Sequence, residues 1–190
     1  MLDADALADV EGDASLLLRI AQVDDDEPVD VVALCRALTG HAPWLSRLGP
    51  QAQLARVGDG YRVCVRRGLL PERARWLVGH ELAEWHYLRT GYRGEDIEAR
   101  CDALGAALVA PRRAFLSAVR ERGHRVYALA DDFGVTHALA LLRIGEVTLR
   151  PVALPRRLGL VVRGEPYAWD ESPSHPVRLR DEGRWGRMAA

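Results

Sequence analysis

One histidine and two glutamates lie close together in residues 75–88, a stretch predicted to be helical. His80 and Glu84 are four residues apart, and one turn of an α-helix brings such positions onto the same face. Glu81 follows His80 directly and lies beside that face. The spacing therefore predicts a helix that presents an imidazole and two carboxylates to a common point.

This spacing matches the zinc-protease pattern H-E-x-x-H, in which two side chains one turn apart bind a metal and the Glu between them activates a metal-bound water. Here the fifth position is Glu84 instead of a second His. The pattern predicts His80 and Glu84 as metal ligands and Glu81 as the catalytic base. Taken alone, Glu84 is more typical of a solvated helix charge and His80 of a hydrogen-bonded core histidine. Trp76 and Trp85 are interpreted as packing aromatics.

A second predicted helix, residues 95–108, supplies a third ligand. Glu98 and Asp102 are four residues apart in it and share a face with small and apolar neighbours. A carboxylate on the core-facing side of a helix needs a partner, because an unpaired buried charge is costly. We expect Glu98 to bind the metal, and Asp102 to accept a hydrogen bond from His80 that fixes its ring orientation.

One His and two Glu form a ligand set that zinc accepts, since imidazole nitrogen and carboxylate oxygen both bind zinc at about 2.0–2.2 Å. A carboxylate in place of a neutral imidazole adds negative charge, which lowers the Lewis acidity of the metal and raises the pKa of its water. Manganese, which prefers oxygen ligands, therefore competes better with zinc. His86 is an alternative ligand, but it lies about 120° around the helix from His80.

The elements that position these residues are helices and one hairpin. A helix over residues 71–90 contains the whole pattern, with Pro in its first turn and Gly after its end. A core-packing helix over residues 31–38 begins after Asp30, a typical N-cap residue, and stops at Gly40. Between residues 52 and 67 the period changes to two around a Gly-Asp-Gly turn. This predicts a β-hairpin, which either roofs the core or holds an extended peptide.

The remaining segments carry no chemistry. A helical run around residues 14–23 is interpreted as an exposed helix followed by an acidic linker. Residues 126–147 resemble a helix-turn-helix in which Thr136 caps the second helix. Acidic side chains in its first helix argue against direct DNA binding. Short strands are predicted at residues 158–162 and 167–169.

These patterns predict an α+β protein with four parts. They are an N-terminal helix with its acidic linker (1–27), a core that holds the site (28–125), the helix-turn-helix-like segment with the C-terminal strands (126–169), and a tail (170–190).

The composition excludes several classes of protein. The 190 residues include 26 basic and 27 acidic ones, and all the basic residues are Arg. The net charge of −1 gives no long-range field for nucleic acid or an anionic membrane. Cys35, Cys64 and Cys101 are too scattered for a disulfide framework and are predicted to be reduced, buried thiols. An acidic N-terminus and the lack of an apolar run of about 18 residues predict a cytoplasmic protein without a membrane span.

Residues from about Pro28 to Pro111 resemble the ImmA/IrrE family of metallopeptidases. That family has a helix begun by Pro-Val-Asp, a small sheet, an H-E-L-x-H helix, and then E-x-x-A-N-x-F-A-A-x-L-L-x-P, to which residues 98–111 are similar. A helix-turn-helix-like segment follows in the family as well. The resemblance implies a zincin-like core, with a small β-sheet packed on the active-site helix and a Glu-bearing helix after it. His80 and Glu98 then correspond to zinc ligands and Glu81 to the catalytic Glu, while Glu84 stands where the family has its second His.

The resemblance also implies an endopeptidase that cleaves or regulates a helix-turn-helix repressor in mobile-element control or stress response. A second hypothesis stays open, because the second His is lost. In it the protein keeps the peptidase fold with a weakened or inactive site, and regulates by binding a protein partner.

Overall fold

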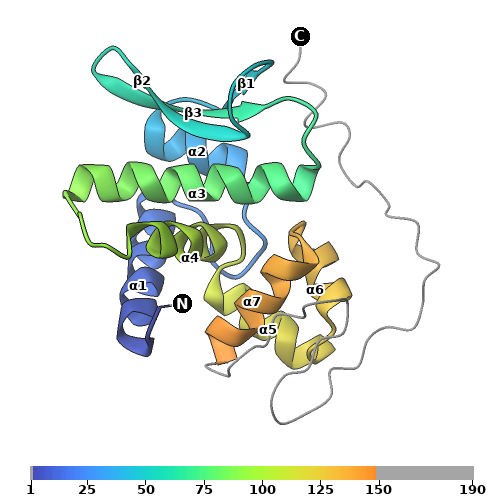
Figure 1. The fold of residues 1–190 in the computed structure, drawn as a ribbon. Coiled ribbons are helices and arrows are strands. Elements are labelled where there is room, and N and C mark those ends of the chain that lie inside the picture. Colours follow the sequence, from blue (N-terminus) through green and yellow to red (C-terminus); the bar gives the residue numbers. More distant parts are fainter. Residues whose placement is uncertain (1, 149–190) are drawn as a thin grey trace.

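The computed structural model describes residues 2–148, which form an α+β fold of seven helices and a three-stranded mixed sheet (Figure 1). The predicted α+β class is thereby confirmed. The elements are α1 (Ala4–Ile20), α2 (Val31–Thr39), β1 (Trp44–Ser46), β2 (Ala52–Val57), β3 (Gly60–Arg66), α3 (Pro71–Thr90), α4 (Ile97–Val109), α5 (Arg112–Arg122), α6 (Val126–Phe133) and α7 (His137–Thr148).

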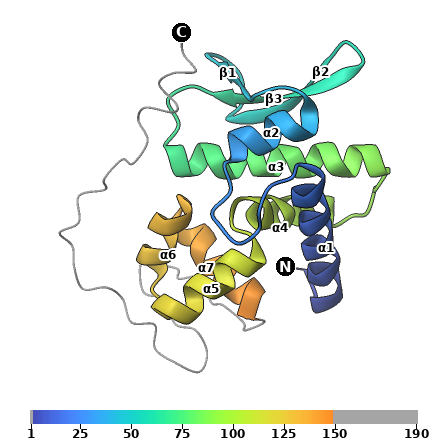
Figure 2. The same ribbon diagram turned by 180° about the vertical axis from the view of Figure 1, so that it is seen from behind.

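The central element is α3, which lies between the sheet on one side and α4 on the other (Figures 1 and 2). It spans Pro71–Thr90, as predicted. Pro71 suits the first helical position, where its missing N–H would have no partner. Gly91 ends the helix at a φ of 78°, and its N–H donates to the carbonyl of Tyr87. Helix α3 is therefore covered on two opposite sides, and two of its ionisable residues, Glu81 and His86, are buried.

The sheet has the order β1-β3-β2. Strands β2 and β3 pair antiparallel with Gln53 opposite Cys64, and Gly58 in the connecting turn has a φ of 60°. The predicted hairpin is therefore confirmed. Strand β1 pairs parallel with β3 and was missed, since three residues are too few to show an alternating pattern. Helix α2 packs against β3 and α3, and Asp30 caps it as predicted.

Helices α3 and α4 cross at a pair of glycines. A Cβ atom added at Gly79 would lie 2.7 Å from the carbonyl oxygen of Gly105, and one added at Gly105 would lie 2.7 Å from the backbone nitrogen of His80. Contacts this short leave no room for any side chain. The two backbones therefore touch next to His80, and this close approach brings the side chains of α4 to the site.

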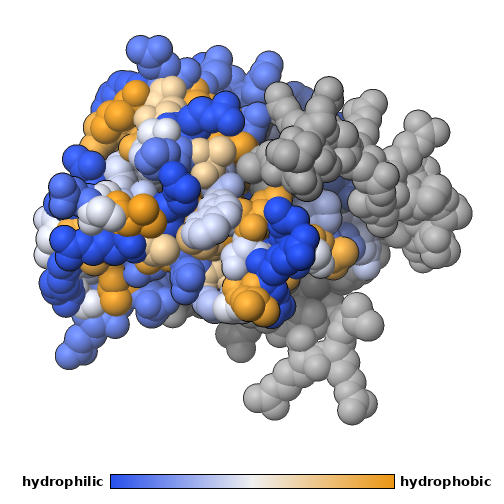
Figure 3. Space-filling view, turned by 90° about the horizontal axis from the view of Figure 1, so that it is seen from above, coloured by the Kyte–Doolittle hydropathy of each residue, from blue (hydrophilic) through white to orange (hydrophobic). Residues whose placement is uncertain are grey.

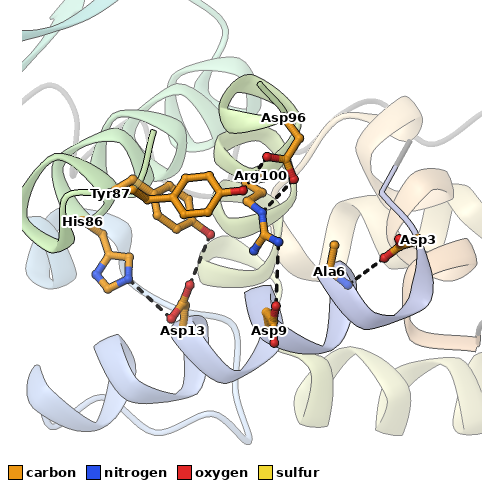
Figure 4. A network of polar contacts seen from close by, with 9 residues as sticks. Asp3, Ala6, Asp9, Asp13, His86, Tyr87, Asp96 and Arg100 are labelled. Carbon is orange, nitrogen blue, oxygen red and sulfur yellow. Dashed lines mark hydrogen bonds and ion pairs between the residues drawn. The ribbon is translucent and has the colours of Figure 1, made fainter. Parts of the chain in front are cut away.

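Helix α1 is packed into the core, so the prediction of an exposed N-terminal helix is wrong. Val10 and Leu17 are buried, and α1 contacts α4. The polar side of α1 contacts α3. Asp13 accepts a hydrogen bond from the Tyr87 hydroxyl at 3.2 Å, and its carboxylate lies 3.5 Å from His86 Nε2 (Figure 4). In the sequence, acidic residues stand next to the apolar positions of α1, so its buried apolar face could not be recognised from the pattern.

The helix-turn-helix-like segment, α6 and α7, packs with α5 on the core. The Thr136 hydroxyl accepts a hydrogen bond from the backbone N–H of Leu139, as predicted for a cap. Arg143 of α7 is 1% exposed. It donates to the Ala110 carbonyl at 2.9 Å and to the Glu11 carboxylate of α1. The guanidinium of Arg143 is thus buried and held by hydrogen bonds within the protein, so it is not available to bind DNA.

Other predictions fall partly outside the described residues. The strands predicted at residues 158–162 and 167–169, and the tail at 170–190, lie beyond residue 148. Within residues 2–148 all three cysteines are buried and free of disulfides, as expected. No helix in this part of the chain is long and apolar enough to span a membrane.

Candidate metal centre

His80 lies at the crossing of α3 and α4 and meets both predicted partners from α4. Its Nδ1 atom is 2.9 Å from Asp102 Oδ1, and its Nε2 atom is 3.8 Å from Glu98 Oε2. The contact with Asp102 is a hydrogen bond, which limits the orientations open to the His80 ring. With Asp102 accepting from Nδ1, the lone pair of the neutral imidazole is on Nε2, which is directed to Glu98.

The acidic surroundings favour a proton on His80. The hydrogen bond to Asp102 is the main cause that raises the pKa of His80, and burial partly opposes it. The negative charges of Asp102, Glu81 and Glu98 raise this pKa further. An environment that attracts a proton to an imidazole also attracts a metal cation, and the two compete for Nε2.

Glu81 is buried next to His80 and only 5% exposed. Within the described residues its Oε2 atom has no hydrogen-bond partner. Burial raises the pKa of Glu81 to about 7, with a further contribution from the charge of Glu84. A carboxyl group that titrates near neutral pH suits a general base, because it can both take and return a proton.

Glu84 is the predicted ligand that the structure does not bring together with the others. Among residues 2–148, the one group of three or more ligand side chains whose atoms all lie within 4.8 Å of one another is Asp24, Asp25 and Asp26. His80, Glu84 and Glu98 therefore do not converge to that distance. Glu84 lies beside Glu81 instead, close enough to influence its pKa.

Two of the predicted ligands, His80 and Glu98, lie near the separation that a shared metal ion would require. A tetrahedral zinc bound to one nitrogen and one oxygen holds these atoms about 3.4 Å apart. The distance between His80 Nε2 and Glu98 Oε2 is 3.8 Å, so a small movement of one side chain suffices. Glu98 is 85% exposed and free to make it. Glu84 does not complete the set in this arrangement. His86 is no substitute, because its Nε2 atom lies 3.5 Å from Asp13 Oδ1 of α1.

Two further residues lie beside the site: Trp76, which the sequence predicts only as a packing aromatic, and Arg73, to which it assigns no role. The Trp76 ring centroid is 5.5 Å from that of His80, and the Arg73 guanidinium lies 4.5 Å from the Trp76 ring centroid. Positions 73, 76 and 80 lie on one face of a helix, so their spacing contained this signal. The buried thiol of Cys101 also lies near the site, and burial raises its pKa to about 12, so it stays protonated.

The acidic triad Asp24–Asp26 is a different kind of cluster. It lies in the connection after α1, where Arg113 pairs with both Asp25 and Asp26. These three residues are consecutive in the chain, so their proximity follows from the sequence, and Arg113 partly neutralises two of them.

The pKa of Glu81 predicts how stability depends on pH in metal-free protein. Its folded-state pKa of about 7 lies above the ordinary value of 4.5, so between these values the folded protein binds more protons than the unfolded chain. Stability is then greatest below the unfolded value and falls as the pH rises through 7. The full shift corresponds to about 3 kcal/mol, and partial hydration of the site reduces this to about 2 kcal/mol.

The measurement is urea unfolding in a chelator at pH 5 and pH 8, for the wild type and Glu81→Gln. The variant should gain about 2 kcal/mol relative to the wild type on going from pH 5 to pH 8. Glu72→Gln, a change in the first turn of α3, should leave the pH dependence unaltered. Equal pH dependence in the wild type and Glu81→Gln would show that Glu81 titrates normally.

No protein-family model matches this sequence, and no curated protein matches it. Among solved structures, a "Mycobacterium tuberculosis transcriptional regulator" has a similar fold, with a TM-score of 0.58 and 15% sequence identity. The match covers 73% of this chain and 46% of the regulator, so this chain corresponds to less than half of that protein. At this identity the likeness concerns the fold.

Proposed function

We propose that this protein is a metal-dependent endopeptidase of the ImmA/IrrE type, with zinc as the metal and manganese as an alternative. One observation carries the proposal: His80, fixed by Asp102 and directed to Glu98, lies beside a buried carboxyl group, Glu81, that has an unpartnered oxygen. His80 and Glu98 would bind the metal, and Glu84 would join them by rotating its side chain.

The residues of the chain then divide the chemistry among them. When bound, the metal supplies a Lewis acid that polarises the scissile carbonyl and makes water more acidic. Glu81 accepts a proton from the attacking water and delivers it to the leaving amine. Its pKa of about 7 suits both steps at neutral pH. Asp102 keeps the ring of His80 in the orientation that leaves Nε2 available.

Metal analysis tests this proposal. Purified protein, stripped with a chelator and dialysed against zinc or manganese, should bind one equivalent of metal, and His80→Ala should bind none. His41→Ala, a change at an exposed histidine outside the site, is the matched control and should bind as the wild type does. Failure of the wild type to bind either metal would remove the proposal.

The proposed substrate is a cytoplasmic protein partner such as a helix-turn-helix repressor. The family resemblance supports this choice, and the description of the similar M. tuberculosis structure as a transcriptional regulator agrees with a regulatory setting. Direct binding of nucleic acid is not proposed, because Arg143 in α7 is buried against Glu11 and Glu146.

A second candidate function is regulation by binding alone, with an inactive site. The ligand atoms of His80, Glu84 and Glu98 do not all lie within 4.8 Å of one another, which favours this candidate, since two ligands hold a metal less tightly than three. The two functions differ in one variant. Glu81→Gln should abolish the regulatory effect of a peptidase, and should leave the effect of a binding module intact.

A further inference from the structure

Three residues form a continuous stripe along α3 from its first turns to the candidate metal centre. Arg73, Trp76 and His80 fall within about 60° of one another around the helix axis. The guanidinium of Arg73 lies 4.5 Å from the ring centroid of Trp76, and that ring lies 5.5 Å from the ring of His80. A ligand that reaches His80 from this direction therefore passes over an aromatic ring and a cation.

Arg73 is held in place without a neutralising partner. Its Nε atom donates a hydrogen bond to Gln51 Oε1 at 3.2 Å, which fixes the guanidinium against the segment before β2. Within residues 2–148 it forms no ion pair with a carboxylate. The side chain is exposed, so its positive charge is available to an incoming ligand.

The segment that contains the sheet and Arg73, residues 44–73, carries a net positive charge. Residues 44–73 contain two carboxylates, Asp59 and Glu72, against six arginines, none of which pairs with a carboxylate in the described part of the chain: Arg47, Arg56, Arg62, Arg66, Arg67 and Arg73. Figure 3 looks onto this layer from above and shows strongly hydrophilic side chains next to hydrophobic ones. The metal-site end of the stripe is acidic instead, with Glu81, Glu84 and Glu98.

We infer that Arg73 and Trp76 form a substrate subsite that selects an acidic residue to one side of the scissile peptide bond. This inference rests on the proposed peptidase function. Arg73 is seven residues from His80, a distance of about 10 Å along the helix axis. An extended peptide covers about 3.3 Å per residue, so the selected Asp or Glu would be about three residues from the scissile bond. The guanidinium binds the carboxylate, and the Trp76 ring packs against the residues between.

Cleavage-site profiling tests the inference. Metal-loaded protein is incubated with a peptide library derived from a digested proteome, and the new termini are identified by mass spectrometry. The wild type should show at least a fivefold enrichment of Asp and Glu at about the third position on one side of the cleaved bond. Arg73→Glu should abolish this enrichment and favour Arg or Lys there, and Arg73→Lys should retain it in part.

Arg89→Glu is the matched control. Arg89 also lies over a tryptophan of α3, 4.9 Å from the Trp85 ring centroid, but its position is about 160° around the helix from Arg73. This variant should cleave with the profile of the wild type. Metal content and melting temperature are measured for each variant, so that a profile is compared only between folded, metal-loaded proteins.

The outcomes separate the inference from the function on which it rests. Absence of cleavage by metal-loaded wild type contradicts the peptidase function itself. Cleavage without acidic enrichment, or with an enrichment that survives in Arg73→Glu, overturns the subsite and leaves the peptidase function standing. Acidic enrichment that is lost in Arg73→Glu and kept in Arg89→Glu establishes the subsite.

Discussion

Peptide cleavage should fall by at least a hundredfold when Glu81 is replaced by Gln, with metal binding retained. Gln has nearly the same shape as Glu but cannot accept a proton, and loss of a general base typically costs a factor of about 10²–10⁴ in rate. Metal binding is retained because the proposed ligands are His80, Glu84 and Glu98. The measurement is kcat/KM on a peptide or repressor substrate, together with the metal content of each protein.

Two further variants make this result interpretable. Glu72→Gln removes a carboxylate from the first turn of the same helix and should cleave as the wild type does. Glu84→His restores the second histidine of the H-E-x-x-H pattern and should raise cleavage, because a neutral ligand leaves the metal a stronger Lewis acid. Cleavage by Glu81→Gln within threefold of the wild type would assign the proton transfer to another group.

Replacement of Gly105 by Ala should destabilise the protein by about 3 kcal/mol, at the upper end of what overpacking costs. The added Cβ would lie 2.7 Å from the backbone nitrogen and 2.9 Å from the Cα atom of His80. Backbone atoms in the middle of a helix cannot yield as a flexible side chain can, so α4 must move away from α3. The free energy of unfolding, measured by urea titration, checks this prediction.

The matched control is Gly12→Ala in the middle of α1. A Cβ atom at Gly12 meets no other atom within 4 Å, and Ala is the better helix former by about 0.5–1 kcal/mol. This variant should therefore be more stable than the wild type. If Gly105→Ala is stabilised as well, the two helices are not in backbone contact.

The same substitution should also affect the candidate metal centre. Asp102 and Glu98 reach His80 because the backbone of α4 touches that of α3 at Gly79 and Gly105. Separation of the helices lengthens both contacts, and metal binding depends on them. Weaker metal binding by folded Gly105→Ala is thus expected along with its lower stability.

The elements closest to the site could be predicted from the sequence because local signals agree there. Helix α3 has Pro71 at its start and Gly91 at its end, and α2 has Asp30 and Gly40 in the corresponding roles. The hairpin has an alternating pattern on both sides of a glycine turn. In each case the residues that specify the element lie within the element or next to it.

The contacts of the site were partly predictable for the same reason. The four-residue spacing of Glu98 and Asp102 placed both carboxylates on one face of α4, and both contact His80. The prediction that this face is turned to the core is wrong, because the two side chains are 85% and 59% exposed. The role of Arg73 and Trp76 depends on the directions of side chains that a sequence leaves open. The position of Glu84 does as well, because the sequence leaves open that its side chain interacts with Glu81 and does not converge with His80 and Glu98.

The sequence by itself determined which stretches are helix or strand near the site, and which side chains each helix presents on a common face. Only the tertiary structure decided that α1 is buried, that Arg143 is enclosed by carboxylates, and that α3 and α4 touch at two glycines. Periodicity and capping act over a few residues and are visible in the chain. The approach of two backbones and the pairing of Arg143 with Glu11 join residues far apart in the chain, and those depend on how the whole core packs.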